Sequence, residues 1–269
     1  MIDLHCHILP GIDDGPVNLD FSIAMARTAE EAGIVVMVAT PHVRSDHPNE
    51  PEGIEAAVRE LNAALAVENV DLRVLPGAEV SLQKAEELSD ETLSSLCLGS
   101  GDCLLVESPY RSIDIDLEGI LWDVQARGFR PVLAHPERCP IFQRDPTRLA
   151  RLVNGGVLCS ITAASLAGRF GTTVRKFSLE LLYDGLIHDV ASDAHDHLHR
   201  PPDLLKGFES AEEVVPGIRG QATWFTITAP VAILTGKPLP RPPDPPPRPP
   251  TSRWRRLVRP PAARTSKQV

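Results

Sequence analysis

The segment Met1-Ile2-Asp3-Leu4-His5-Cys6-His7, continued by Ile8-Leu9-Pro10-Gly11-Ile12-Asp13-Asp14-Gly15, determines how the rest of the chain is interpreted. Its first four residues are mostly apolar and predict an opening β-strand. Alternate residues of a strand point to the same side, so His5 and His7 share one face. Two imidazoles on one face, beside an acidic glycine-containing loop, can bind one metal ion. The sequence therefore predicts metal chemistry at the end of the first strand.

Apolar, β-branched runs alternate with amphipathic stretches after this segment. The further strands are expected at residues 34–40, 72–78, 103–107, 131–135, 156–161 and 187–192. Helical patterns lie between them at residues 20–32, 53–67, 116–127, 147–153 and 174–183. This alternation predicts an α/β fold with parallel strands joined by crossover helices. With seven candidate strands, the pattern fits both an open doubly wound sheet and a closed barrel.

The composition indicates one large globular domain. The chain has 269 residues, of which 42% are hydrophobic, enough for a substantial core. No apolar stretch approaches the roughly 20 residues that span a bilayer. The N-terminal segment is polar from residue 3 and does not resemble a secretory signal. We therefore expect a cytoplasmic protein whose five cysteines stay reduced.

The C-terminal part differs in composition from the rest. Residues 237–269 are rich in proline and carry nine Lys and Arg with Asp244 as the only acid, a net charge of +8 against −17 for residues 1–236. We expect one folded domain over 1–236 and a disordered, polyproline-like tail over 237–269. The acidic body makes nucleic acid an unsuitable ligand. The tail has either no specific partner or a weak contact with a protein or an anionic membrane surface, and Trp254 among arginines favours the membrane surface.

Imidazole and carboxylate side chains stand where the expected strands end. Together with Asp14 of the first loop they are His5, His7, His42, Glu79, Glu107, His135, Asp193 and His195. The carboxyl ends of parallel strands converge on one site, so we expect these nine side chains to meet. They are too many for one ion and suit two or three divalent metals with a bridging carboxylate. Manganese, iron and catalytic zinc all fit the mixed donor set.

These motifs together resemble the PHP-domain metallophosphoesterases, and among them the bacterial manganese-dependent tyrosine phosphatases of the CpsB/YwqE type. The resemblance covers roughly residues 1–236. It rests on His5-x-His7, Leu9–Gly15, Thr40-Pro41-His42, Gly77-x-Glu79, Val106-Glu107, His135-Pro136-Glu137-Arg138 and Ser192-Asp193-Ala194-His195. The family implies a distorted seven-stranded (β/α) barrel, the PHP fold, with a trinuclear centre in which Mn²⁺ is the expected metal.

The resemblance also implies how the ligands divide. His5, His7, Glu79 and Asp193 would hold one metal, Glu79 would bridge to a second held by Glu107 and His135, and Asp14, His42 and His195 would hold the third. Arg138 and Arg200 match arginines that hold phosphate, and His42 is expected to take part in catalysis. A planar guanidinium pairs with two phosphate oxygens at once. Each arginine could instead form a surface salt bridge.

The implied function is metal-dependent hydrolysis of phosphotyrosine in proteins. The expected substrate is a bacterial tyrosine kinase that regulates capsule and exopolysaccharide synthesis, and a homo-oligomer is compatible with the sequence. The cysteine route is excluded, because no arginine stands six residues after any cysteine, as a phosphate loop around a thiolate requires. Three further functions fit part of the pattern: a small-molecule phosphatase of the histidinol phosphate kind, an amidohydrolase, which would want a carbamylated lysine, and a non-catalytic metal-bound regulatory module.

Overall fold

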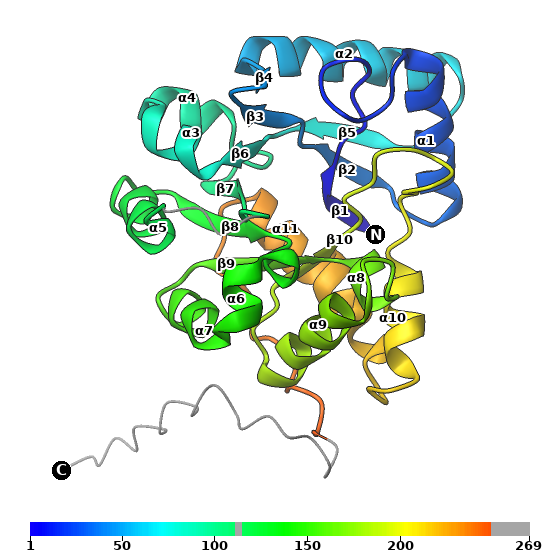
Figure 1. Ribbon diagram of the computed structural model, residues 1–269. Coiled ribbons are helices and arrows are strands. Elements are labelled where there is room, and N and C mark those ends of the chain that lie inside the picture. Colours follow the sequence, from blue (N-terminus) through cyan, green and yellow to red (C-terminus); the bar gives the residue numbers. More distant parts are fainter. Residues whose placement is uncertain (111–114, 249–269) are drawn as a thin grey trace, which may run out of the picture.

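The computed structural model describes residues 1–110 and 115–248, in which a core of strands is surrounded by helices (Figure 1). The strands are β1 (Ile2–Cys6), β2 (Val36–Ala39), β3 (His42–Arg44), β4 (His47–Pro48), β5 (Arg73–Pro76), β6 (Glu79–Ser81), β7 (Cys103–Glu107), β8 (Arg130–Ala134), β9 (Leu158–Thr162) and β10 (Asp189–Ala191). All adjacent strands pair in parallel except β3 and β4. The predicted parallel α/β class is therefore confirmed.

The helices follow the strands along the chain. They are α1 (Leu19–Glu31), α2 (Pro51–Val67), α3 (Leu82–Glu87), α4 (Asp90–Ser95), α5 (Leu117–Ala126), α6 (Pro140–Arg144), α7 (Pro146–Asn154), α8 (Ala163–Leu166), α9 (Thr172–Asp184), α10 (Leu205–Glu212) and α11 (Ala229–Leu234), with 3₁₀ turns at Pro136–Arg138 and Arg219–Gln221 and a π-helical turn at Trp224–Thr228. Within residues 1–110 and 115–248, no helix is long and apolar enough to cross a membrane.

The strands divide into two sheets and do not form one continuous ladder. The first sheet has the order β1-β2-β5 and the second has the order β10-β9-β8-β7-β6-β3-β4. The strands predicted at residues 34–40 and 72–78 correspond to β2 and β5, and each is followed, after a short interruption, by a strand that was not predicted, β3 and β6. The second interruption contains Gly77, where a Cβ atom would lie 2.8 Å from the Val38 side chain. A larger residue would therefore clash where the strands change sheets.

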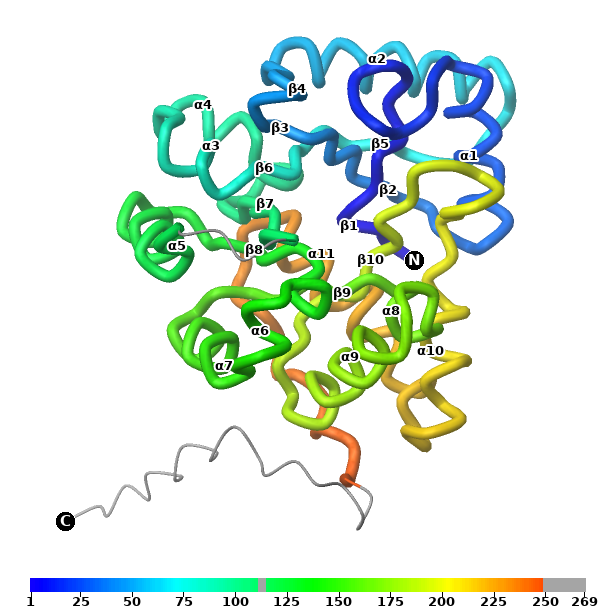
Figure 2. The backbone as a smooth tube through the Cα atoms, in the orientation of Figure 1, coloured from blue at the N-terminus to red at the C-terminus, as the bar shows by residue number. Residues whose placement is uncertain are grey.

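The two ends of the strand array meet at the N-terminus. A parallel bridge joins Cys6 to Ala194, and the His7 amide donates to the Ala194 carbonyl at 2.9 Å. The backbone trace shows β1 beside β10 although the two lie far apart in the sequence (Figure 2). The first histidines of the chain are thereby placed next to the last acidic motif.

A separate apolar cluster is built largely from residues of strands β1, β2, β7, β8 and β9. We call it the apolar floor, and its buried members are Ile2, Leu4, Val38, Leu98, Cys103, Leu105, Val132, Ala134, Leu158, Ile233 and Leu234. Helix α11 supplies Ile233 and Leu234. A larger core cluster packs between the strands and the surrounding helices. The floor leaves the carboxyl ends of the strands for polar residues.

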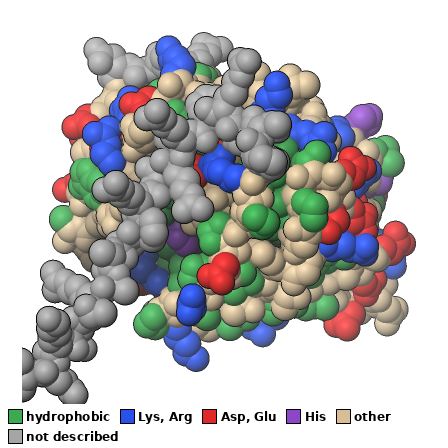
Figure 3. Space-filling view, turned by 90° about the horizontal axis from the view of Figure 1, so that it is seen from below, with side chains coloured by type: hydrophobic (Ala, Val, Ile, Leu, Met, Phe, Trp, Pro, Cys, Tyr) green, Lys and Arg blue, Asp and Glu red, His purple; other side chains and the backbone are tan. Residues whose placement is uncertain are grey.

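The start of the proline-rich segment contacts helix α9. Residues 237–248 form no helix or strand, but the Arg248 guanidinium forms ion pairs with Glu180 and, at 2.6 Å, with Asp184 of α9. It also lies over the Tyr183 ring, 5.4 Å from its centroid. On the described part of the face seen from below, basic and acidic side chains are interspersed (Figure 3). The rest of the expected tail, with Trp254, lies outside the described residues.

Candidate functional site

The nine residues predicted as ligands converge at the carboxyl ends of the strands. They are His5, His7, Asp14, His42, Glu79, Glu107, His135, Asp193 and His195. All except Asp14 are buried. Short strands position two of them directly, because β3 begins at His42 and β6 begins at Glu79. These two residues are opposite each other in the parallel pairing of β3 and β6.

The potential ligand atoms form four overlapping groups, each with all its atoms within 4.8 Å of one another. The groups are His7, Asp14, His42 and His195; His5, His7 and Asp193; His5, Glu79 and His135; and His42, Glu79 and Glu107. Every predicted ligand belongs to at least one group. The division differs from the one implied by the resemblance, since Glu107 groups with His42 and not with His135. Glu79 belongs to two groups, as a bridging carboxylate would.

Several buried imidazole nitrogens at this site have no hydrogen-bond partner among the described residues. They include Nε2 of His5, Nε2 of His7 and Nδ1 of His42. His5 Nε2 lies 3.5 Å from Glu79 Oε2, and His7 Nε2 lies 3.5 Å from Asp193 Oδ1. These separations are long for hydrogen bonds. A cation with bonds of about 2 Å to both kinds of atom fits between them, so the donor set fits a bound divalent metal.

Asp13 supports the site, although only its neighbour Asp14 was predicted. A 2.7 Å contact joins Asp13 Oδ2 to His7 Nδ1, and the same oxygen accepts the His42 amide at 3.2 Å. Burial lowers the pKa of His7, but the hydrogen bond to Asp13 and the nearby carboxylates of Asp193 and Glu79 outweigh it and raise that pKa well above its usual range. Asp13 thus fixes the His7 ring with Nε2 toward the cluster. The adjacent acids Asp13-Asp14 were the signal in the sequence.

Two of the ligand residues have a left-handed backbone. His135 has φ of 36° and Asp193 has φ of 51°. Such conformations cost non-glycine residues about 1–3 kcal/mol and persist where neighbours hold them. The Asp193 amide donates to the His5 carbonyl at 2.8 Å, and the His135 carbonyl accepts from the Arg138 amide at 2.9 Å. These backbone conformations place both side chains in the ligand cluster.

The surroundings favour the metal-binding protonation states of two ligands, Asp193 and His135. Burial would raise the pKa of Asp193, but Arg138 and His5 lower it well below its usual range. Burial, followed by the positive charge of Arg138, lowers the pKa of His135 to about 4. Burial and the Glu79 carboxylate together raise the pKa of Glu107 to about 7. At neutral pH the Asp193 carboxylate is therefore ionised and the His135 imidazole is neutral, as ligation requires.

Both predicted phosphate-binding arginines lie at the mouth of the site. They line a cavity of about 440 Å³ together with Asp14, His42, Glu79, Asp193 and His195. The Arg138 guanidinium bonds the Asp193 carboxylate, donates to Thr162 Oγ1 at 3.0 Å and lies 4.6 Å from the centroid of the Phe170 ring. Arg200 Nη2 donates to Asp193 Oδ2 at 2.8 Å. Both guanidinium groups are therefore held beside the ligand cluster.

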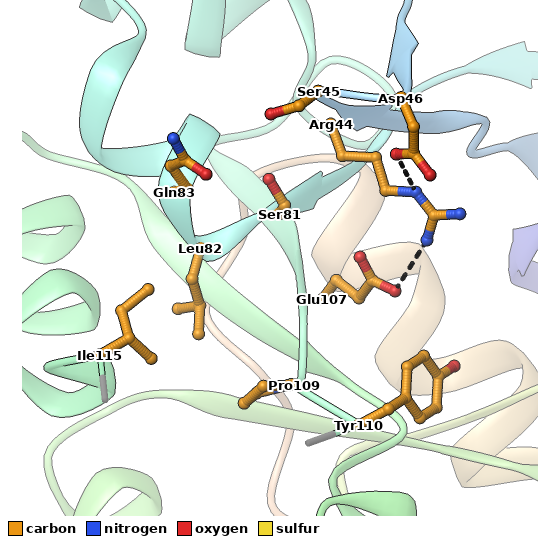
Figure 4. A pocket seen from close by; sticks show the side chains of 10 residues that line it. All are labelled: Arg44, Ser45, Asp46, Ser81, Leu82, Gln83, Glu107, Pro109, Tyr110 and Ile115. Atoms are coloured by element: carbon orange, nitrogen blue, oxygen red, sulfur yellow. Dashed lines mark hydrogen bonds and ion pairs between the residues drawn. The ribbon is translucent and has the colours of Figure 1, made fainter. Parts of the chain in front are cut away.

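A second cavity of about 440 Å³ adjoins the first and shares Arg44 and Tyr110 with it. Arg44 lies between two acids in this cavity, 2.8 Å from Asp46 and 3.4 Å from Glu107 (Figure 4). Tyr110 Oη lies 3.2 Å from His135 Nε2. Sequence reasoning missed both residues, since neither belongs to a recognisable motif.

Thiol chemistry has no support in the structure. All five cysteines are buried, and burial raises the pKa of each thiol. None of them lines the cavities described above. This agrees with the sequence, which lacks the spacing of a cysteine phosphatase.

Fold and site together define a metal-binding α/β protein of the kind that places its chemistry at the carboxyl ends of parallel strands. The comparison with family models is more specific. The model of the CpsB/CapC family, described as capsular polysaccharide synthesis, matches residues 1–218. The chain belongs to this family.

Individual proteins similar to this chain support the same family assignment. Tyrosine-protein phosphatase YwqE of Bacillus subtilis (strain 168) is 41% identical over 197 residues, which is 73% of this chain and 78% of YwqE. A crystal structure reported for YwqE from Bacillus subtilis and CpsB from Streptococcus pneumoniae, described as unique metal-dependent tyrosine phosphatases, matches with a TM-score of 0.80 and 35% identity. It covers 92% of this chain and all of that one. The lactonase Lmo2620 from Listeria monocytogenes shares the fold alone, with a TM-score of 0.57 and 12% identity over 88% of this chain and 95% of that one.

Proposed function

We propose that this chain is a metal-dependent phosphatase that hydrolyses phosphotyrosine in proteins. The observation that carries the proposal is the set of unpartnered, buried imidazole nitrogens facing carboxylates, with Arg138 and Arg200 beside them. An imidazole and carboxylate cluster next to two guanidinium groups suits a phosphate monoester, since cations neutralise its charge. The family and the named activities of its relatives support the same reaction.

The nine clustered residues are proposed as the ligands of two or three divalent cations, with Mn²⁺ as the expected ion. When bound, such cations lower the pKa of water toward about 7 and neutralise phosphoryl oxygens. We also infer that the two sheets act as the walls of a distorted seven-stranded barrel, in which β2 with β3 and β5 with β6 each count as one strand. The Cys6 to Ala194 bridge supports closure.

The residues of the chain would act on the phosphate by position and charge. Arg138 and Arg200 would bind phosphoryl oxygens, each with two N–H donors, in place of part of their contact with Asp193. His42 lies in two of the ligand groups and would hold the cluster together at the mouth of the pocket. A tyrosine phenolate, with a pKa near 10, leaves readily, so no strong general acid is required.

The partner is proposed from the family. A phosphorylated bacterial tyrosine kinase that regulates capsule or exopolysaccharide synthesis would be the substrate, and the enzyme would act in the cytoplasm. Both statements go beyond the site itself, which recognises the phosphotyrosyl group.

The test compares substrates and arginine variants. Phosphate release from a phosphotyrosyl peptide should exceed release from histidinol phosphate, and the Arg138→Lys and Arg200→Lys variants should each lose about 10- to 100-fold in kcat/KM, because an ammonium cannot pair two oxygens. His42→Ala should lose activity as well. Arg151→Lys on α7, whose side chain is exposed, is the matched control. A preference for histidinol phosphate would contradict the tyrosine assignment, and full activity of both arginine variants would contradict the site.

A further inference from the structure

A third cavity, of about 300 Å³, opens beside the catalytic pocket near the start of α10. It shares Phe170, Asp193 and Arg200 with that pocket, so a substrate bound at one can extend into the other. Two further cationic residues line it, Arg169 in the loop after α8 and Lys206 in α10. A side chain next to the phosphotyrosine in a peptide could therefore reach this cavity.

The charges of this cavity are not balanced by its own acids. Both Arg169 and Lys206 are exposed, and neither forms an ion pair within the part of the chain that the structure describes. Asp203 also lines the cavity, but its Oδ1 atom accepts the Lys206 amide at 3.0 Å at the start of α10. The Asp193 carboxylate is engaged by Arg138 and Arg200. The Asp203 carboxylate offsets one of the two charges, so Arg169 and Lys206 face solvent with a net positive charge.

The cavity of Figure 4 offers the opposite arrangement. Its arginine, Arg44, already pairs with Asp46 and Glu107. An anion entering there would meet two carboxylates together with one cation. Both cavities adjoin the catalytic pocket. One side of the pocket opening is therefore more positively charged than the other. An acidic group of a bound substrate is attracted to the side of Arg169 and Lys206.

We propose that the cavity lined by Arg169 and Lys206 is a second anion subsite, which binds an acidic group of the same phosphotyrosyl polypeptide. The proposal rests on the proposed function and adds a substrate preference to it. A carboxylate and a second phosphate share the required chemistry. The Phe170 ring forms an apolar wall at the junction with the catalytic pocket, against which the stem of the acidic side chain can pack.

The experiment uses three sets of phosphotyrosyl peptides with the full-length, metal-loaded protein. The first has neutral flanking residues. In the second, one glutamate is moved from one to three residues before or after the phosphotyrosine. In the third, the same positions carry a phosphonate analogue of phosphotyrosine that the enzyme cannot hydrolyse. The Arg169→Gln/Lys206→Gln double variant is compared with Arg73→Gln, which replaces an exposed arginine at the first residue of β5, at the opposite end of the strands.

In the wild type, kcat/KM should rise about three- to tenfold over the neutral peptide for at least one acidic position, mainly through a lower KM. The gain should shrink as salt is added, because exposed charges are screened. It should disappear in the double variant and persist in Arg73→Gln, while turnover of the neutral peptide stays unchanged in both. A gain with glutamate would identify a carboxylate subsite, and a gain with the phosphonate alone would identify a phosphate subsite.

Two results would overturn the subsite. One is equal turnover of all peptides at every position, and the other is an acidic preference that survives in the double variant. Calorimetric binding of peptides in which the central phosphotyrosine is also a phosphonate keeps this test separate from catalysis. If the wild type binds the acidic and neutral peptides with equal affinity there, the subsite is rejected even if hydrolysis occurs. Absence of turnover with charge-dependent binding intact would instead reject the proposed function.

Discussion

The same strands carry two opposite environments along their length. Residues within the strands contribute to the apolar floor, in which Leu4, Leu105 and Val132 are fully or almost fully buried among other hydrophobic side chains. Their carboxyl ends carry the nine residues of the ligand cluster, which are also mostly buried but are imidazoles and carboxylates. Residues that stabilise the core and residues that form the ligand cluster therefore lie only a few positions apart along the same strand.

The apolar floor and the ligand cluster differ in whether their own residues stabilise the fold. The floor is stable because burying apolar surface is favourable in itself. The ligand cluster is costly, since buried polar atoms without partners and left-handed backbone both cost free energy. It persists because the floor and the outer helices hold the strand ends in place. We expect substitutions in the two regions to have different signatures.

The largest effect is expected in the ligand cluster. Glu79→Gln removes the carboxylate shared by two of the ligand groups and should lower kcat/KM on a phosphotyrosyl peptide by at least about 10³-fold, equivalent to about 4 kcal/mol. The bound metal content should fall with it, while the circular dichroism spectrum stays that of the folded protein. Glu91→Gln, at an exposed position of α4, serves as the control. Wild-type turnover in Glu79→Gln would break the distinction between the two regions.

The next effect is expected in the floor. Leu105→Ala leaves a cavity at a fully buried position and should lower the free energy of unfolding by about 2–5 kcal/mol. At temperatures where the variant remains folded, its kcat/KM should match the wild type. Denaturant titration measures the first quantity, and Val67→Ala, at an exposed position of α2, should change stability by less than about 0.5 kcal/mol. A large loss of kcat/KM in folded Leu105→Ala would show that the floor also sets the chemistry.

A buried acid between strands should make stability depend on pH. Burial raises the pKa of Asp189 in β10 to about 8, and its Oδ2 accepts from Ser160 at 2.6 Å. The folded state therefore keeps a proton that the unfolded state loses above about pH 4. Stability should fall as pH rises from about 5 to 8, with a slope of up to about 1.4 kcal/mol per pH unit from this group.

Asp189→Asn should flatten that slope. Unfolding is measured in denaturant with excess chelator across this range, so that ligand protonation does not change metal binding during the series. The slope contributed by Asp3, whose pKa burial raises to about 6, should remain in the variant below that pH. An unchanged slope in Asp189→Asn would show that this carboxyl is ionised in the folded protein.

The smallest effect is expected outside both regions. Arg248→Ala removes the ion pairs with Glu180 and Asp184 and the contact with the Tyr183 ring, and should lower the free energy of unfolding by about 1 kcal/mol without changing kcat/KM. Arg241→Ala, whose side chain is 88% exposed, should change neither quantity. Equal stability of the two variants would show that the segment before residue 249 is not held on α9.

Much of the site was predictable because it depends on topology alone. Once parallel strands are expected, every polar residue at a strand end is directed to one edge, and the strand at residues 103–107 was predicted with the bounds it has. Ligands such as Glu107 and His135 follow from that rule without further information. The short interruptions were not predictable in the same way. The apolar run predicted as a strand at residues 34–40 corresponds to β2, which ends at Ala39, and only three-dimensional pairing begins a further strand, β3, at His42.

The residues that support the site depended on contacts distant in the sequence. Tyr110 lies near His135, 25 positions away, and no local pattern indicates that contact. The helical segments over residues 205–234 were also missed. There α10 contains Gly207, and a π-helical turn precedes α11, which begins with Ala229-Pro230, so the helical period is broken several times.

The central claim is that the clustered imidazoles and carboxylates hold divalent cations on which turnover depends. Elemental analysis of the purified protein, with phosphotyrosyl turnover measured before chelation, after it and after Mn²⁺ is restored, tests this most directly. We expect two or three divalent ions per chain, loss of turnover with the chelator and recovery with Mn²⁺. Turnover at the full rate by protein shown to contain no metal would contradict the claim.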